Sequence, residues 1–421
     1  MPRIAMISVH TCPMATLGGK CTGGMNVYVR ELSRELGRRG IEVDVFTRAQ
    51  NTTPRIGSLG PDAVNVRVVH IPAGPRAPYP KDKTWDYLPR FVEGVKAFTA
   101  ADGDGYDLID AHYWLSGWVA RELKAAWEVP WIQRFHTLGH LKNSVAKPSE
   151  WEPSRRIRVE AELMADADIL VAANPTERES MVALYGAPEE RIRIVPCGVD
   201  SNLFRPIPRD EALERVAIPC GHRMILYVGR IEPLKGIDTL LRAMALMAQS
   251  VPDAEEDLCL AIIGGDPEGE SDPWDSEMSR LREMEKGLGL ANLITFLGSR
   301  NQEDLPYYYA AAEVCVVPSR YESFGMVALE AMACGTPVIA SRVGGLAHTV
   351  QDGITGYLVP EGDAQALADY LQCLLSDEEM RRSMGRHGAR VAKEYSWPMV
   401  ADSVQALYGE LRIGQAAPSG G

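Results

Sequence analysis

The sequence predicts an α/β protein of two Rossmann-like domains, each a parallel sheet flanked by helices. Short apolar segments of strand length alternate with segments of helical periodicity almost throughout the chain, which is the order of βα units around a parallel sheet. The same succession of strand, Gly-rich turn and helix occurs in both halves. With 421 residues, 46% of them apolar, the chain has the length and apolar content for two or three domains.

The first series of elements starts near the amino terminus. Residues 4–9 form an apolar segment, and a loop that ends at Gly23-Gly24 follows it. Residues 27–39 have the spacing of an amphipathic helix, which Gly40 would end because a residue without Cβ tolerates the left-handed conformation. The other strands expected in this half are residues 41–47, 64–71, 108–111, 131–135, 169–172 and 192–195.

The second series follows the Pro- and charge-rich stretch 205–210, which is typical of a domain boundary. A strand over 224–228, Gly229 and a helix over 238–249 open this series. The further strands expected are residues 258–263, 294–297, 314–317, 337–340 and 356–358. The domain organisation that we expect is an amino-terminal domain of residues 1–204, a second domain of residues 205–395, a helix over 396–412 that packs back towards the first domain, and a disordered tail of residues 413–421.

Composition excludes several classes of protein. The net charge of −13 argues against duplex nucleic acid or an anionic membrane as the main partner. No apolar run approaches the ~18 residues of a membrane span, and the six apolar or small residues before His10 are too few for a signal-peptide core. The eight cysteines are scattered without a C-x-x-C pair. This pattern indicates neither a disulfide framework nor a zinc site, and it fits a cytoplasmic protein.

Polar residues and glycines follow the expected strands of both halves. In open parallel sheets, ligands bind at the carboxyl ends of the strands, so this pattern indicates a two-domain protein that uses a nucleotide. The residues concerned are His10, Gly23-Gly24, His112, His136, Gly229, Arg230, Gly264-Gly265 and Glu322. The G-x-G-x-x-G fingerprint and the P-loop are both missing from the sequence, so hydride transfer and ATP hydrolysis lack their usual phosphate-binding loops.

The most informative segment is Glu322-Ser323-Phe324-Gly325-Met326-Val327-Ala328-Leu329-Glu330. We expect it to open a helix with Ser323 as N-cap, so that the first amides favour a phosphate. Glu330 would lie ~12 Å along that helix, and carboxylates accept hydrogen bonds well from sugar diols. Arg230 and Lys235 supply the charge for a leaving diphosphate. Separately these are usually surface charges, but together, after Gly-rich turns of one domain, they favour a binding site.

These motifs resemble the GT-B-fold retaining glycosyltransferases, the family of sucrose-phosphate synthase and of the inositol-phosphate N-acetylglucosaminyltransferase of mycothiol biosynthesis. The E-x7-E string and the run 335–338 are specific to the family, and the resemblance spans residues 8–345. The segments most similar to the inositol-phosphate branch are 23–29, 112–117, 136–138 and 142–143. The resemblance implies the GT-B fold, with two Rossmann-like domains that face each other across a cleft.

The resemblance also implies roles for the donor-side residues. Gly24 would approach the donor diphosphate, which Arg230 and Lys235 would clamp. Glu330 would bind the donor ribose, and Arg300 matches a donor-side arginine of the inositol-phosphate branch. The transferred sugar would contact Glu322 and the amides of Phe324, Gly325 and Met326, with His136 near the anomeric carbon.

On the acceptor side, the resemblance assigns four residues to the phosphorylated acceptor: His10, Asn26, Tyr113 and Thr137. A lysine (Lys81 or Lys83) and an arginine (Arg155, Arg156 or Arg158) would hold its phosphate, and we take Lys81 and Arg156 as the candidates. The alternative for the arginines is a set of i,i+4 pairs with glutamates on a helix surface.

One position departs from the inositol-phosphate branch. That branch has an acidic residue two positions before the first glycine of Gly23-Gly24, where this chain has Cys21. A carboxylate for acceptor hydroxyls is therefore missing. Fructose 6-phosphate or another phosphorylated polyol stays open beside inositol phosphate.

We therefore expect a retaining transferase that moves a hexosyl or N-acetylhexosaminyl group from a UDP-sugar to a small phosphorylated acceptor. Cationic side chains would neutralise the leaving diphosphate, so no metal or other cofactor is required, although a structural magnesium ion stays open. Two other functions fit the same architecture: a nucleotide-sugar epimerase, which forms product without an acceptor, and a non-catalytic sensor of sugar nucleotides. We expect no nucleic-acid partner and no membrane span, and a homodimer is compatible with the sequence.

Overall fold

The computed structural model describes residues 2–15, 23–50, 53–77, 79, 81–148, 151–216, 223–250, 258–265 and 273–411. They form two compact units. The first comprises the described residues up to 197 together with 397–411, and the second comprises those of 198–396. The division falls a few residues before the expected boundary at 204/205. Residues near 200 belong to the second unit because the Val199 amide donates to the Tyr395 carbonyl (2.8 Å) and the Phe204 ring lies against Tyr309 (6.0 Å).

The first unit contains an eight-stranded sheet in the order β3-β4-β2-β1-β5-β6-β7-β8. All neighbours are parallel except β3, which runs antiparallel to β4. The strands are β1 (Arg3–Ile7), β2 (Glu42–Arg48), β3 (Ile56–Gly57), β4 (Val66–Ile71), β5 (Leu108–His112), β6 (Trp131–Arg134), β7 (Ile169–Ala172) and β8 (Ile192–Ile194). The order reverses between β1 and β5, so the loops after these two strands diverge and leave room for a ligand.

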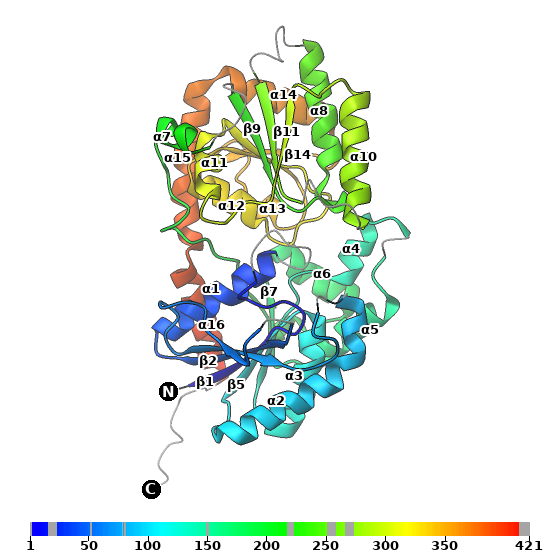
Figure 1. Cartoon of the computed structure of the whole chain (residues 1–421), viewed down its shortest axis with the longest axis vertical. Helices are drawn as coiled ribbons and strands as arrows, with labels where there is room; N and C mark the ends of the chain where they lie inside the picture. Colours follow the sequence, from blue (N-terminus) through cyan, green and yellow to red (C-terminus); the bar gives the residue numbers. More distant parts are fainter. Residues whose placement is uncertain are drawn as a thin grey trace. The chain divides into compact units, whose positions relative to one another are not determined.

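Helices cover both faces of this sheet (Figure 1). They are α1 (Gly24–Arg38), α2 (Leu88–Asp102), α3 (Trp114–Trp127), α4 (Gly139–Val145), α5 (Ser154–Asp166) and α6 (Pro175–Tyr185), with 3-10 turns η1 (Lys81–Tyr87) and η3 (Glu189–Arg191). The carboxyl-terminal helix α16 (Trp397–Glu410) packs against α1. Its Trp397 ring lies edge-on to Tyr28 (5.4 Å), and Asp402 pairs with Arg39 (2.6 Å).

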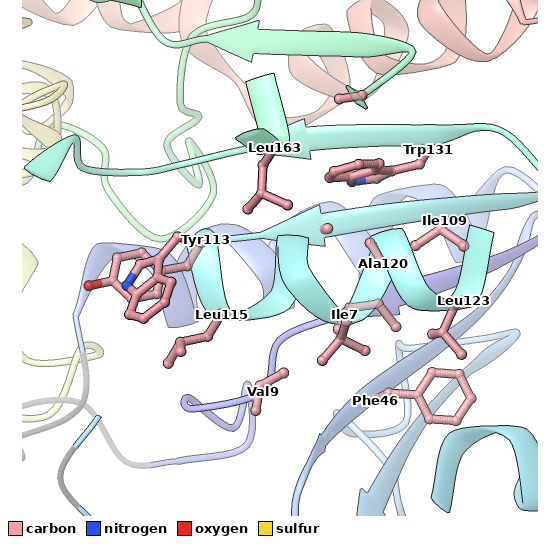
Figure 2. Close-up of a cluster of buried hydrophobic side chains, with 14 of the residues drawn as sticks. Ile7, Val9, Phe46, Ile109, Tyr113, Leu115, Ala120, Leu123, Trp131 and Leu163 are labelled. Atoms are coloured by element: carbon pink, nitrogen blue, oxygen red, sulfur yellow. The ribbon is translucent and has the colours of Figure 1, made fainter. Parts of the chain in front are cut away.

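The core of the first unit lies where α3 packs on the strands. Figure 2 shows Leu115, Ala120 and Leu123 of α3 beside strand residues such as Ile7 and Ile109. All five side chains are fully buried. Truncating one such leucine typically costs about 2–5 kcal/mol, so this cluster fixes α3 and the loop that precedes it.

The second unit contains a fully parallel six-stranded sheet in the order β11-β10-β9-β12-β13-β14. The strands are β9 (Arg223–Val228), β10 (Leu258–Ile263), β11 (Ile294–Gly298), β12 (Val314–Val317), β13 (Val338–Ser341) and β14 (Gly356–Val359). Here the order reverses between β9 and β12. The loops after these two strands therefore flank the expected ligand position of this unit.

The helices of the second unit also lie on both faces of its sheet (Figure 1). They are α7 (Arg209–Arg215), α8 (Ile237–Ser250), α10 (Pro273–Gly287), α11 (Leu305–Ala311), α12 (Met326–Ala333), α13 (Leu346–Thr349), α14 (Ala364–Ser376) and α15 (Glu378–Ala392), with 3-10 turns η4 (Pro233–Lys235) and η5 (Lys393–Tyr395). Within the described parts of both units, no helix has the length and apolar character needed to cross a bilayer.

Candidate functional site

The expected donor-side residues, apart from Gly24, lie in the second unit at the carboxyl ends of its strands. Lys235 ends η4, and the next residue, Gly236, has φ +65°. A Cβ there would meet the Pro318 carbonyl oxygen at 2.0 Å, so only glycine lets this turn pack against the loop after β12. The turn brings the Lys235 ammonium to Glu322, with Nζ donating to Oε2 at 2.6 Å, and each side chain is 20% exposed.

Arg230 and Arg300 each contact a residue outside this ion pair. Arg230, after β9, pairs with Glu232 at 2.7 Å and is 46% exposed. Arg300 follows β11 at the sheet edge, where its Nε donates to the Tyr308 hydroxyl (3.1 Å). Arg230 thus follows a strand beside the strand reversal, whereas Arg300 lies beyond β10, two strands from β9.

The start of α12 differs from the expectation. Ser323 is not the N-cap, because its hydroxyl donates to the Tyr321 hydroxyl (3.1 Å); the N-cap is Gly325, with φ +94°. A Cβ on Gly325 would lie 2.5 Å from the Leu346 side chain. Gly325 has no side chain that could cap the helix. The amides of its first turn are therefore available to an anion.

A pair of glycines after β13 fixes the loop that carries Glu322. The Gly345 amide donates to the Glu322 carbonyl at 2.9 Å. A Cβ on Gly344 would lie 2.1 Å from the same carbonyl oxygen, and one on Gly345 would lie 2.3 Å from the Phe324 Cα. This role was not expected from the sequence, although a Gly-Gly pair in the loop after a strand was a visible signal.

Glu330 lies in the second turn of α12 and is 8% exposed. The hydroxyl of Tyr309 donates to its Oε2 at 2.9 Å. Burial raises the pKa of Glu330 to about 7, against the lowering effect of the Tyr309 hydrogen bond. Tyr309 was also missed. It is held by Thr336 of the run 335–338, whose hydroxyl donates to the Tyr309 carbonyl (2.6 Å).

In the first unit, the loops after β5 and β6 bring two histidines together. His112 Nδ1 and His136 Nε2 are 2.9 Å apart, and the rings stack with centroids at 5.1 Å. Burial lowers the pKa of both imidazoles well below the usual value, so the pair is neutral at pH 7. His136 has φ +60°, and the Tyr28 ring packs edge-on against it (5.3 Å).

Behind the histidines lies a buried ion pair of Asp110 and Arg134. The Tyr408 hydroxyl from α16 donates to Asp110 Oδ2 at 3.2 Å. His112 Nε2 is 3.6 Å from Asp110 Oδ1. The sequence did not point to three of these residues, Asp110, Arg134 and Tyr408. No sequence signal marks a polar residue within a strand, or in a helix far along the chain, as part of a site.

Three of the expected acceptor residues cluster with Arg156. The Tyr113 ring lies 4.6 Å from His10 and 4.8 Å from the Arg156 guanidinium. Arg156 Nη2 donates to the carbonyl and hydroxyl oxygens of Thr137, at 2.6 and 3.0 Å.

The charge of Arg156 is compensated inside the protein. The side chain is fully buried and pairs with Glu160 (2.7 Å) and Glu152 (2.9 Å). Of the other arginines considered for a phosphate, Arg155 stacks over Trp85 at 5.4 Å and Arg158 is 71% exposed.

The remaining expected residues have backbone roles or lie at element ends. Asn26 is buried, its Nδ2 donating to the Cys12 carbonyl (2.8 Å) and its Oδ1 accepting from the Gly23 amide (3.0 Å). Gly24 begins α1 and Lys81 begins η1. Cys21 lies outside the described residues. Among the residues that are described, no cluster of three His, Cys, Asp or Glu has the arrangement of a metal site.

Comparison with known proteins identifies the family. Residues 208–391 match the family model "Glycosyl transferases group 1", and residues 23–198 match "Glycosyl transferase 4-like domain". A D-inositol 3-phosphate glycosyltransferase of Corynebacterium jeikeium is 39% identical over 99% of this chain and 100% of its own. The chain belongs to the group 1 glycosyltransferase family. This glycosyltransferase is also 41% identical to a D-inositol 3-phosphate glycosyltransferase of Acidothermus cellulolyticus, over 96% of this chain and 90% of the relative.

Among solved structures, this glycosyltransferase is similar to the sucrose-phosphate synthase of Thermosynechococcus elongatus. The TM-score is 0.88 at 38% identity, over 98% of this chain and 99% of that one. The two-domain GT-B fold and the glycosyltransferase activity expected from the sequence are thereby confirmed. The roles of individual residues remain predictions.

Proposed function

We propose that this glycosyltransferase moves a hexosyl or N-acetylhexosaminyl group, with retention, from a UDP-sugar to a hydroxyl of a small phosphorylated polyol or sugar. The observation that carries the proposal is the Lys235–Glu322 pair (2.6 Å) beside the uncapped start of the helix that contains Glu330. Two loops and one helix thus offer a cation, free amides and two carboxylates, which match a diphosphate between two sugars.

On the donor side, Lys235, Arg230 and the first amides of α12 neutralise the diphosphate. When Lys235 turns to a phosphate oxygen, Glu322 is released to accept hydrogen bonds from the transferred sugar. Glu330 accepts from the ribose hydroxyls through the carboxylate oxygen that Tyr309 does not use. Gly24 leaves room for the donor diphosphate because it has no side chain, and Arg300 adds positive charge on the donor side.

On the acceptor side, the cluster of His10, Tyr113 and Thr137 contacts the phosphorylated acceptor, with Lys81 at its phosphate. Arg156 acts through Thr137, whose carbonyl and hydroxyl it fixes. Asn26 shapes the loop around Gly23 through its two backbone hydrogen bonds.

The proposed chemistry needs no nucleophile from the protein. The leaving diphosphate accepts the proton of the acceptor hydroxyl, the C–O bond to the diphosphate breaks, and the new glycosidic bond forms on the same face of the sugar. Positioning and charge stabilisation then supply the rate enhancement. His136 is neutral, so it can hydrogen-bond to the sugar near the anomeric carbon without adding positive charge there.

A matrix of donors and acceptors tests this function. UDP-glucose, UDP-N-acetylglucosamine and GDP-mannose are each incubated with inositol phosphate, fructose 6-phosphate or water. The curated relatives are named for an inositol phosphate and the structural relative for sucrose phosphate, so we expect product with UDP donors and one phosphorylated acceptor. Equal turnover with water would refute the acceptor assignment. Product that is an epimer of the donor, formed without acceptor, would replace the transferase with an epimerase.

We further propose that the enzyme acts in the cytoplasm, as a homodimer, and that residues 396–412 fold with the first domain in solution. Sedimentation equilibrium tests the dimer, and a truncation after residue 395 tests the helix. A monomer at micromolar concentration, or an unchanged melting temperature of the truncated chain, would contradict these two statements.

A further inference from the structure

The second unit contains a basic groove that none of the expected donor or acceptor residues enters. It consists of a cavity of about 600 Å³ and an adjoining one of about 290 Å³, which share Pro206, Arg386 and Ala389 in their walls. Four parts of the unit build it: the segment 201–209, residues 310–313 at the end of α11, residues 333–337 at the end of α12, and one face of α15 with η5. A volume of this size is that of a small-molecule site.

The charge of the groove opposes that of the whole protein. The chain has a net charge of −13, whereas the charged side chains in the walls of the groove carry a net +5. The cations are Arg205, Arg209, Arg381, Arg382, Arg386, Arg390 and Lys393, and the carboxylates are Glu313 and Glu378. Such a concentration of one sign in a concave surface attracts anions.

Part of this charge is used to hold the unit together. Glu313 bridges two arginines, accepting from Arg209 at 2.8 Å and from Arg381 at 2.9 Å. Arg382 pairs with Glu378 one turn earlier on α15, at 2.6 Å. The two carboxylates of the groove therefore offset two of these three positive charges.

The other cations have no such partner. Within the described part of the chain, no carboxylate pairs with Arg205, Arg386, Arg390 or Lys393. All four side chains are exposed. Arg382, Arg386 and Arg390 follow one another at four-residue spacing on one face of α15, and like charges at this spacing destabilise a helix. A bound anion would relieve that repulsion.

The groove is separate from the proposed donor site. Glu313 and Pro337 directly precede β12 and β13, so the groove lies at the amino ends of these strands. Glu322 follows β12 at its carboxyl end. The eight-residue helix α12 connects the two edges, because it starts beside Glu322 and ends at Cys334 in the wall of the groove.

We propose that this groove is a second, small-molecule anion site, which takes a ligand with two phosphate groups. Arg386 and Arg390 bind one phosphate group where the two cavities join, and Arg205 and Lys393 bind the other in the smaller cavity. Guanidinium groups suit phosphate oxygens because their donors match the geometry of the anion. The concave shape and the limited volume of the two cavities favour a free metabolite over a polymer or a membrane surface.

Calorimetric titration with inorganic pyrophosphate tests the site. The full-length enzyme is first saturated with UDP, so that the donor position is occupied. We expect one binding event in the wild type that weakens with added salt. The double variant Arg386→Ala/Arg390→Ala should bind at least about tenfold more weakly, since hydrogen bonds to charged groups are lost.

The matched control is Arg282→Ala/Lys286→Ala on α10 of the same unit, which removes two positive charges at the same i,i+4 spacing. It should bind pyrophosphate like the wild type. Turnover of both variants should match the wild type, and both should unfold cooperatively in a thermal scan, which separates loss of the site from loss of the fold or of the donor site. No pyrophosphate binding to the wild type, or equal affinity of the two double variants, would overturn the proposal. Co-sedimentation with phosphatidylglycerol vesicles that depends on Arg386 and Arg390, without pyrophosphate binding, would also overturn it, in favour of a membrane surface.

Discussion

The ion pair between Lys235 and Glu322 predicts an unusual response of nucleotide binding to mutation. In the free protein the two side chains are joined at 2.6 Å and are each 20% exposed, so Lys235 must leave Glu322 before it can bind a diphosphate. A partly buried pair of this kind is worth about 1.5 kcal/mol net, between the values for exposed and buried pairs. Glu322→Gln should therefore tighten the binding of UDP by about tenfold, because UDP lacks the transferred sugar that Glu322 is proposed to contact. Turnover of a UDP-sugar should nevertheless fall, because the proposed contact between the carboxylate and the transferred group is lost.

The assay is calorimetric titration of UDP into a double-mutant cycle. Lys235→Ala should weaken UDP binding by about 3 kcal/mol, roughly a hundredfold, and in that background Glu322→Gln should have no further effect. Glu361→Gln is the control, since it removes a carboxylate of the same unit that pairs with Arg320 at 3.2 Å; it should leave UDP binding unchanged. Weaker UDP binding by Glu322→Gln, or tighter binding that persists without Lys235, would refute the exchange of partners.

Three further predictions concern two buried charged side chains and one loop glycine. Burial holds the pKa of Glu330 at about 7, so the KM for the UDP-sugar should rise as the pH falls below about 7. The stability of the fold should decrease as the pH rises from the unfolded-state pKa of Glu330 through 7. Glu330→Gln should flatten both pH profiles, the first in steady-state kinetics and the second in thermal unfolding. Gly344→Ala should raise the donor KM and lower the melting temperature, because its Cβ would lie 2.1 Å from the Glu322 carbonyl oxygen. The control is Gly353→Ala, whose Cβ would have open space around it. This control should cost only backbone strain of about 1–2 kcal/mol. Arg156→Met should destabilise the fold by about 3–5 kcal/mol in denaturant unfolding, because it leaves buried carboxylates unpaired. If the variant had normal stability and a raised acceptor KM, Arg156 would instead be assigned to the acceptor phosphate.

The sequence predicted the sheets well because their strands are continuous apolar runs. All strands expected from such runs are present, with bounds that shift by one or two residues; the run 337–340, for example, is β13 at Val338–Ser341. Strand β3 was not expected, since Ile56–Gly57 has no apolar run. The start of α12 was misplaced because Ser323 satisfies the local N-cap rule, whereas the packing of Gly325 against Leu346 decides where the helix begins.

The candidate site was predictable only where charge or glycine marks a loop. Lys235 and Glu322 were identified because each follows a strand in a recognisable motif, and the structure joins them. The pairing itself was not predictable, since the two residues are separated by 87 positions. Tyr309 could not be found for the same reason: its contact with Glu330 depends on how α11 packs against α12.

On the proposed acceptor side, backbone conformation is a second feature that could not be predicted from the sequence. Tyr113 and His136 both have positive φ, +79° and +60°, at the carboxyl ends of the neighbouring strands β5 and β6. A side chain in this region costs about 1–3 kcal/mol and is usual only for glycine, so residue type gives no warning of it. The two bends turn the Tyr113 ring towards His10 and bring His136 to His112. Because the buried core under α3 supplies the stability to hold both bends, the strained conformations are consistent with positioning for a ligand rather than with a defect of the fold.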